Sequence, residues 1–261
     1  MKEKFYLFAG PCVIEDEKRI LNQVEEMIKI LGKFEDEIFW VFKASFDKAN
    51  RTSLSSFRGV GLEKGMDIFK KIKEKFNVPV ITDVHETVQV QKVSEVVDFI
   101  QIPAFLCRQT DLLFEAGRTG KPVNIKKGQF MAPEDMVYAV EKVKKGGSKE
   151  VFLTERGTTF GYHNLVVDMR SFLIMRNFGA KVIYDGTHSL QMPSGEKGFS
   201  GGRREFLEPL CKAAVAAGVD GLFLEVHPEP EKALSDKATQ LPLKDLGKLL
   251  EKLLKIREAA K

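Results

Sequence analysis

The chain alternates short, mostly apolar runs with longer segments of mixed polarity. Eight such runs cover residues 5–9, 39–42, 79–82, 99–100, 122–125, 151–154, 181–184 and 221–224. Continuous apolar runs, unlike runs that alternate with polar residues, are typical of strands buried on both faces of a parallel sheet. The pattern therefore predicts eight buried strands.

The segments between these runs have a helical repeat of apolar positions. In residues 17–31, for example, Ile20, Val24, Met27 and Leu31 fall on one helix face. Similar patterns cover residues 62–76, 88–97, 112–117, 133–143, 166–178, 206–217 and 243–256. Strand and helix alternating eight times in about 250 residues is typical of the (β/α)8 TIM barrel. An open doubly wound sheet has the same element order, but we expect a single-domain barrel over residues 1–261, because no linker-like stretch interrupts the chain.

Residues able to do chemistry stand at the ends of the predicted strands. They are Cys12, Lys43, Asp83, Gln101, Lys126, Glu155, Arg156, Asp185, His188 and Glu225. In a TIM barrel the active site lies at the carboxyl ends of the strands. The sequence therefore predicts that these groups meet at one end of the barrel.

Basic and hydroxyl side chains form the densest candidate site. They are Lys43, Ser45, Lys48, Arg51, Thr52 and Ser53 after the second strand, with Lys126 and Arg156 after the fifth and sixth. Such donors in a partly dry pocket suit phosphate and carboxylate oxygens. The alternative is a solvated polar loop. We expect a small substrate with several negative charges.

A second group of candidate residues offers metal ligands. It contains Cys12, His188, Glu225 and Asp236. A thiolate, an imidazole and carboxylates are a plausible ligand set for Zn²⁺, Fe²⁺ or Mn²⁺. Spacing alone leaves the alternative open that Cys12 is a small buried apolar residue.

Composition excludes several classes of partner. The 41 basic and 37 acidic residues are interspersed and give a net charge of +4, and no nucleic-acid-binding motif is present. No apolar run is long enough to span a membrane. Three widely spaced cysteines without a secretion signal indicate a reducing compartment. We expect a cytoplasmic protein with neither nucleic-acid nor membrane partners.

Several motifs closely resemble one enzyme family. They are Ala-Gly-Pro-Cys at 9–12, Lys-Ala-Asn-Arg-Thr-Ser at 48–53, the stretch 101–111, Thr-Glu-Arg-Gly at 154–157, Asp-Gly-Thr-His-Ser at 185–189 and Glu-Val-His-Pro at 225–228. Over nearly the whole chain they resemble the 3-deoxy-D-manno-octulosonate 8-phosphate synthases. The Lys-Ala-Asn-Arg stretch is the specific part, since the related 3-deoxy-D-arabino-heptulosonate 7-phosphate synthases carry Lys-Pro-Arg there.

The resemblance implies a transferase that condenses phosphoenolpyruvate with D-arabinose 5-phosphate and water, in the lipopolysaccharide (KDO) pathway. The expected ligands of phosphoenolpyruvate are Lys43, Lys48, Lys126 and Arg156; those of the sugar are Asn50, Arg51 and Thr52, with Ser45, Asp83, Gln101 and Phe105 in supporting positions. In a homotetramer, Arg108 is expected to reach the sugar phosphate of a neighbouring subunit. The expected catalytic residues are Lys48, Asn50, Cys12, His188 and Asp236.

The family divides into metal-dependent members with Cys after Gly-Pro and metal-independent members with Asn. Cys12 and the stretch 235–240 resemble the metal-dependent branch, which implies that Cys12, His188, Glu225 and Asp236 bind the ion. Three alternatives stay open: a heptulosonate synthase using erythrose 4-phosphate, a Schiff-base aldolase using Lys43 or Lys126, and a non-catalytic sugar-phosphate sensor on the same fold.

Overall fold

Eight parallel strands close into a barrel in the computed structural model, which describes residues 3–51, 53–196 and 199–260. They are β1 (Phe5–Gly10), β2 (Ile38–Lys43), β3 (Val80–Asp83), β4 (Phe99–Ile102), β5 (Val123–Lys126), β6 (Val151–Glu155), β9 (Lys181–Asp185) and β12 (Gly221–His227). β12 pairs with β1, with Leu224 opposite Ala9, which closes the sheet. The two-residue strand β13 (Leu241–Pro242) extends the edge of β12. The predicted (β/α)8 barrel is confirmed.

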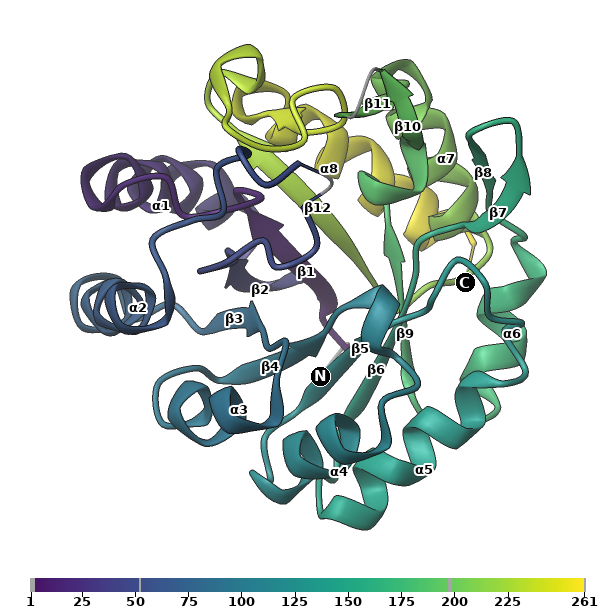
Figure 1. The fold of residues 1–261 in the computed structure, drawn as a ribbon. Helices are drawn as coiled ribbons and strands as arrows, with labels where there is room; N and C mark the ends of the chain where they lie inside the picture. The colour runs from purple at the N-terminus through teal and green to yellow at the C-terminus, as the bar shows by residue number, and fades with distance from the viewer. Residues whose placement is uncertain (1–2, 52, 197–198, 261) are drawn as a thin grey trace.

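Helices form a ring around the strands (Figure 1). They are α1 (Glu17–Leu31), α2 (Leu62–Phe76), α3 (Thr87–Ser94), α4 (Thr110–Arg118), α5 (Met136–Gly146), α6 (Arg170–Arg176), α7 (Leu207–Ala216) and α8 (Leu243–Ala259). The predicted helical segments 17–31 and 62–76 coincide with α1 and α2 at both ends. Local chemistry explains these bounds: the Asp16 side chain accepts from the backbone N–H of Arg19 at 2.9 Å, and α2 ends at Asn77 in the left-handed region. No helix of the described ranges is long and apolar enough to cross a membrane.

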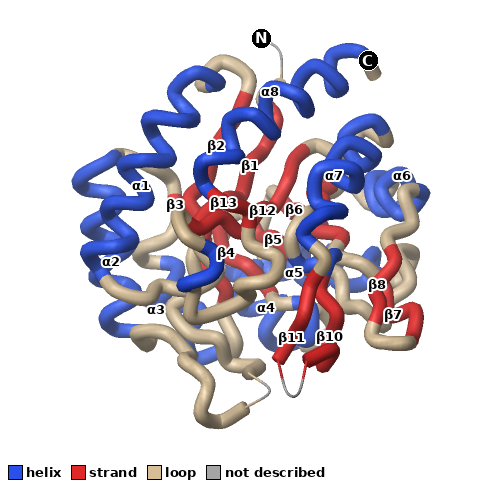
Figure 2. The backbone as a smooth tube through the Cα atoms, turned by 90° about the horizontal axis from the view of Figure 1, so that it is seen from above, coloured by secondary structure: helices blue, strands red, loops and turns tan. Residues whose placement is uncertain are grey.

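Two antiparallel hairpins follow barrel strands, and the apolar periodicity did not predict them. β7 (Thr158–Gly161) pairs with β8 (Asn164–Val166), and β10 (Gln191–Glu196) pairs with β11 (Phe199–Gly202). The second hairpin contains the glycines of the stretch 192–202 that the structure describes. Figure 2 shows both hairpins at one end of the barrel and both chain termini near the other.

Two apolar clusters make the core. The larger one fills the space between the strands and the helices. The smaller one plugs the barrel itself and contains Phe8, Val41, Ile81, Phe99, Phe152, Ile183 and Phe223. Its rings meet edge to face, with the centroids of Phe8 and Phe152 5.4 Å apart. The barrel is therefore a packed core rather than a pore, and any site must lie above this plug.

Candidate active site

Strand alternation points the polar strand ends into the barrel mouth. Side chains two residues apart on a strand share a face, and the plug residues Val41, Ile81, Ile183 and Phe223 stand two positions before Lys43, Asp83, Asp185 and Glu225. All four of these polar side chains are buried. The predicted convergence of distant strand ends is confirmed for this set.

Glu225 on β12 lies at the centre of the mouth. Its Oε1 is 3.3 Å from Lys43 Nζ, 3.7 Å from Lys48 Nζ and 3.2 Å from His188 Nε2. Burial alone would raise the pKa of Glu225, but the positive charges of these three groups hold it well below its usual range. The buried Oε2 has no hydrogen-bond partner among the described residues, which leaves it as an acceptor for a ligand.

Asp185 on β9 organises a second group of charges. It accepts a hydrogen bond from Lys126 Nζ, and its Oδ2 lies 2.7 Å from His188 Nδ1. Lys126 Nζ also sits 3.1 Å from the ring centroid of Phe223. Burial lowers the pKa of Lys126 to about 8, although the negative charge of Asp185 opposes the shift.

Three of the four predicted metal ligands form a compact group. The ligand atoms of Cys12, Glu225 and Asp236 all lie within 4.8 Å of one another, and Cys12 Sγ is 3.0 Å from Asp236 Oδ2. Ser235 Oγ, which belongs to the stretch 235–240 but was not a predicted ligand, is 2.8 Å from the same sulfur. Burial raises the pKa of the Cys12 thiol well above its usual value, and the charges of Asp236 and Glu225 reinforce the shift.

His188, the fourth predicted ligand, lies beside this group rather than within it. Its Nδ1 is fixed by Asp185, which turns Nε2 towards Glu225. A histidine held by a carboxylate through one ring nitrogen is the usual arrangement of a metal ligand. Together with the orphaned Oε2 of Glu225 and the sulfur and oxygen donors, this arrangement fits a divalent transition ion.

Gln191 links the basic and the acidic parts of the mouth. Its Oε1 accepts from Arg156 at 2.7 Å, and its Nε2 donates to Asp236 Oδ1 at 3.0 Å. The other terminal nitrogen of Arg156 is buried and has no hydrogen-bond partner in the described chain. No pattern of apolar positions marks Gln191, because it lies beyond the barrel strands, at the start of β10.

Further polar side chains lie on or just after β3 to β6. Asp83 Oδ2 lies 3.0 Å from His85 Nε2, while Asp83 Oδ1 is buried without a hydrogen-bond partner among the described residues. Gln101 accepts from Asn124 at 3.3 Å, and Asn124 in turn accepts from Thr154 at 2.6 Å. His85 thus makes a hydrogen bond with the last residue of β3.

Only part of the stretch after β2 contacts the mouth. Ser45 Oγ is 3.1 Å from Lys43 Nζ and 3.4 Å from Lys48 Nζ. Arg51 turns to the backbone, with Nε donating to Phe57 O at 3.0 Å. Thr52 lies outside the described residues.

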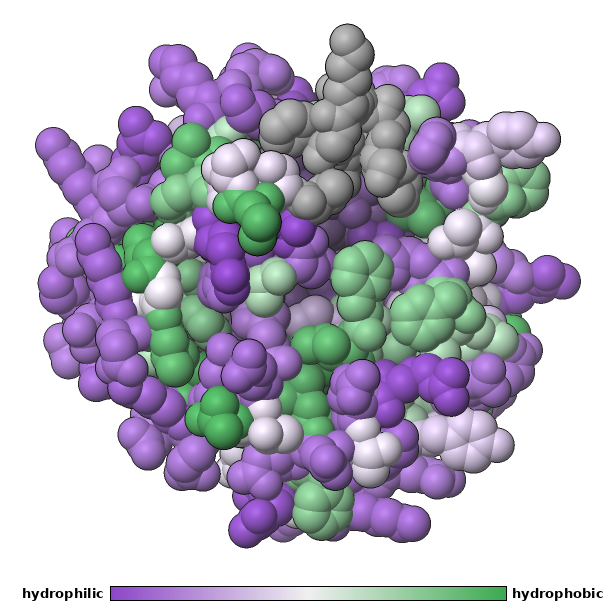
Figure 3. Space-filling view, in the orientation of Figure 1, coloured by the Kyte–Doolittle hydropathy of each residue, from purple (hydrophilic) through white to green (hydrophobic). Residues whose placement is uncertain are grey.

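Three predicted site residues are exposed on the loops around the mouth. They are Asn50, Phe105 and Arg108. The guanidinium of Arg108 makes no hydrogen bond or ion pair within the described ranges, whereas its backbone oxygen accepts from Lys142 at 3.2 Å. Figure 3 shows apolar side chains standing among hydrophilic ones on this face of the molecule.

The full length of the chain, residues 1–261, matches the DAHP synthetase I family. The chain belongs to this family. It is 57% identical over 247 residues to the 2-dehydro-3-deoxyphosphooctonate aldolase of Geobacter metallireducens (95% of this chain, 90% of the relative). It is also 55% identical over 256 residues to that of Desulfotalea psychrophila (97% and 90%) and 56% identical over 259 residues to that of Koribacter versatilis (98% and 92%). These relatives confirm the family resemblance that the sequence motifs indicated.

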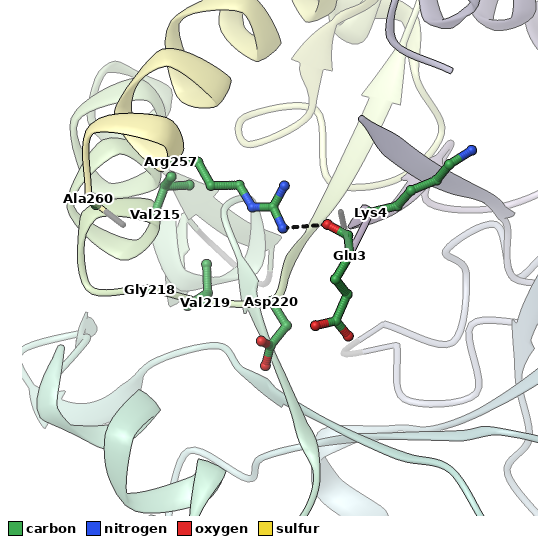
Figure 4. A pocket seen from close by; sticks show the side chains of 8 residues that line it. All are labelled: Glu3, Lys4, Val215, Gly218, Val219, Asp220, Arg257 and Ala260. Carbon is green, nitrogen blue, oxygen red and sulfur yellow. Dashed lines mark hydrogen bonds between the residues drawn. The ribbon is translucent and has the colours of Figure 1, made fainter. Parts of the chain in front are cut away.

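A small pocket at the opposite end of the barrel lacks the features of an active site (Figure 4). It is lined by Glu3, Lys4, Val215, Gly218, Val219, Asp220, Arg257 and Ala260. Arg257 donates to the backbone oxygen of Glu3 at 2.8 Å, and Asp220 accepts from Arg176 and from the backbone N–H of Val182. Its charges are of both signs, and several are paired. The mouth is therefore the candidate active site of this family member.

Proposed function

We propose that this family member acts as a 3-deoxy-8-phosphooctulonate synthase, condensing phosphoenolpyruvate with D-arabinose 5-phosphate and water. Its close relatives are named 2-dehydro-3-deoxyphosphooctonate aldolase. The structural observation that carries the proposal is the convergence of Lys43, Lys48, Lys126 and Arg156 at one buried mouth. Cations held in a dry site suit a substrate with a phosphate and a carboxylate.

The residues of the mouth act mainly by binding and orientation. The unpaired nitrogen of Arg156 and the ammonium of Lys126 donate to the anionic groups of phosphoenolpyruvate, and Asp185 fixes Lys126 in place. A carbon–carbon bond forms between C3 of phosphoenolpyruvate and the aldehyde carbon, water adds at C2, and the C–O bond to phosphate breaks. During these steps negative charge shifts between the reacting groups. Fixed cations stabilise this charge and hold the two substrates in register.

We further propose that Cys12, His188, Glu225 and Asp236 hold a divalent transition ion, Zn²⁺, Fe²⁺ or Mn²⁺. The grouped ligand atoms of Cys12, Glu225 and Asp236 and the unpaired oxygen of Glu225 support this assignment. When bound, the ion supplies a Lewis acid that orients the sugar and positions or activates water. Asp185 keeps the His188 ring oriented towards Glu225.

A substrate panel tests the proposed activity. Purified protein is given phosphoenolpyruvate with D-arabinose 5-phosphate or with erythrose 4-phosphate, and inorganic phosphate is measured. We expect preferred turnover of the pentose phosphate and its loss in Lys126→Met, while Lys181→Met, at the other end of the barrel, stays active. Preferred turnover of erythrose 4-phosphate would make the protein a heptulosonate synthase, and absence of phosphate release would leave a sugar-phosphate sensor.

One observation favours a Schiff-base aldolase as the second candidate. A pKa of about 8 leaves part of the Lys126 amine neutral near pH 7.5, as a Schiff-base lysine requires. Borohydride added with the substrates distinguishes the two mechanisms. A covalent adduct on Lys126 in the protein mass spectrum supports the aldolase, whereas unchanged mass during turnover supports the synthase.

For the assembled enzyme we propose a homotetramer in which Arg108 completes a neighbouring site. The exposure of Arg108 and of the aromatic side chains Phe105, Phe130 and Phe160 on this face supports the proposal. Light scattering measures the mass in solution. Arg108→Ala and Lys126→Met are each expected to be inactive, and a co-assembled mixture is expected to recover activity because the two defects lie in different subunits. A monomer, or a mixture without recovery, contradicts the proposal.

A further inference from the structure

Lys127 and Glu155 form a buried ion pair that the proposed reaction does not use. Lys127 Nζ is 3.4 Å from Glu155 Oε1, and the two side chains are 0% and 2% exposed. The ammonium also donates to Thr158 Oγ1 at 3.0 Å and to the backbone oxygen of Met131 at 3.2 Å. The cation therefore joins the loop after β5 to the loop after β6.

The pair stands directly beside two residues of the substrate site. Lys126 precedes Lys127, and Glu155 precedes Arg156. Lys126 lies over the plug ring of Phe223 in the mouth, whereas Lys127 contacts the loops outside it. Fixing Lys127 and Glu155 therefore fixes the backbone from which Lys126 and Arg156 reach inwards.

Further hydrogen bonds make this connection rigid. Glu155 Oε1 also accepts from the backbone N–H of Gly157 at 2.7 Å, which closes the turn that contains Arg156. Gly157 has φ +91°, a conformation that side chains other than glycine rarely adopt. The backbone N–H of Lys127 donates to Thr154 O at 2.8 Å, next to the same turn.

Stability is a poor explanation for such a pair. Taking two charges out of water is costly, and apolar residues of similar volume often replace buried ion pairs without loss of stability. A buried pair does hold its surroundings in one arrangement, because any other arrangement leaves a charge unpaired. Here the surroundings are the two cationic strand ends.

We propose that Lys127 and Glu155 are positioning residues that set the distance between Lys126 and Arg156 for phosphoenolpyruvate. This inference rests on the proposed function, in which those two cations hold phosphoenolpyruvate. The pair touches no substrate; it acts through the residues next to it. Without the pair, the two loops relax separately. This weakens the binding of an anion held by both loops much more than the binding of a sugar held elsewhere.

The decisive variant replaces both charges at once, Lys127→Met with Glu155→Leu. It leaves no unpaired buried charge, so thermal stability is expected to be retained. Calorimetric titration with phosphoenolpyruvate alone is expected to give a Kd raised about tenfold or more, since small misplacements of binding groups cost this much. The KM for arabinose 5-phosphate is expected to change less than about twofold. The matched control, Lys181→Met, removes a cation paired with Glu150 at the start of β6 and is expected to leave both constants unchanged.

A second variant, Glu155→Gln, tests the positioning role if the double variant does not fold. The Gln side chain keeps an oxygen that accepts from Gly157, but it removes the negative charge and leaves the buried Lys127 ammonium without its counter-ion. A raised Kd for phosphoenolpyruvate is expected again. Wild-type affinity in the folded double variant, or in Glu155→Gln, overturns the positioning role. Wild-type protein that releases no phosphate from the substrates overturns the proposed function instead, so the two failures are distinguishable.

Discussion

Raising the pH is expected to weaken phosphoenolpyruvate binding through a single side chain, Lys126. Burial sets its pKa near 8. In the proposed function, phosphoenolpyruvate binds the ammonium form. A group with this pKa is about nine-tenths protonated at pH 7 and about one-tenth at pH 9, so the apparent Kd is expected to rise about tenfold over this interval. The ligand itself does not change charge between pH 7.5 and 9, because the second pKa of a phosphate is about 6.

Calorimetric titration of phosphoenolpyruvate into the protein at several pH values measures this effect. Lys126→Met keeps the length of the side chain and removes its charge, so its Kd is expected to be high and independent of pH. The wild-type curve is expected to approach that of the variant above pH 9. Binding above pH 8 also takes up a proton, which changes the measured enthalpy between buffers of different ionisation enthalpy. A flat wild-type profile, or equal slopes in the two proteins, refutes the assignment of the titration to Lys126.

Three further predictions concern the metal ligands and the barrel. Chelation is expected to abolish activity and Cys12→Ala to lose the bound ion, as elemental analysis measures; full activity of metal-free protein contradicts this. Phe152→Ala, which opens a cavity in the plug, is expected to cost about 3–5 kcal/mol in denaturant unfolding, and a loss below about 1 kcal/mol would show that the plug collapses. Gly10→Ala places a Cβ 2.1 Å from the backbone oxygen of Lys43 and is expected to lower stability by about 1–3 kcal/mol. Gly32→Ala, which meets nothing within 4 Å, is the control and is expected to be neutral or stabilising.

Apolar periodicity predicted the barrel and the groups that stand at its strand ends, because both depend on which residues are buried. The strand ends Lys43, Asp83 and Glu225 follow from alternation alone. The same rule does not extend past the last strand residue. Gln191, at the start of β10, and Ser235, in the loop before β13, lie beyond the barrel strands, where tertiary contacts fix the backbone. No periodicity marks them.

The sequence alone does not distinguish the roles of two adjacent lysines. Lys126 and Lys127 follow the same strand, and the motif resemblance selected Lys126. Only the structure shows that Lys127 is the more deeply buried of the two and pairs with Glu155. A buried lysine usually has a charged partner, but the sequence does not show which carboxylate lies near it.

The aromatic plug and the charged mouth depend on each other physically. Several barrel strands place an apolar residue below and a polar one above. In β12, Phe223 stands two positions before Glu225, and its ring also lies under the ammonium of Lys126. Aromatic rings exclude water from beneath the charges, which strengthens their interactions in a medium of lower dielectric constant. The same exclusion lowers the pKa of Lys126, whereas a neighbouring carboxylate alone would raise it. Packing in the barrel therefore helps to set the charge state of Lys126 and, with it, the anion affinity proposed for the mouth.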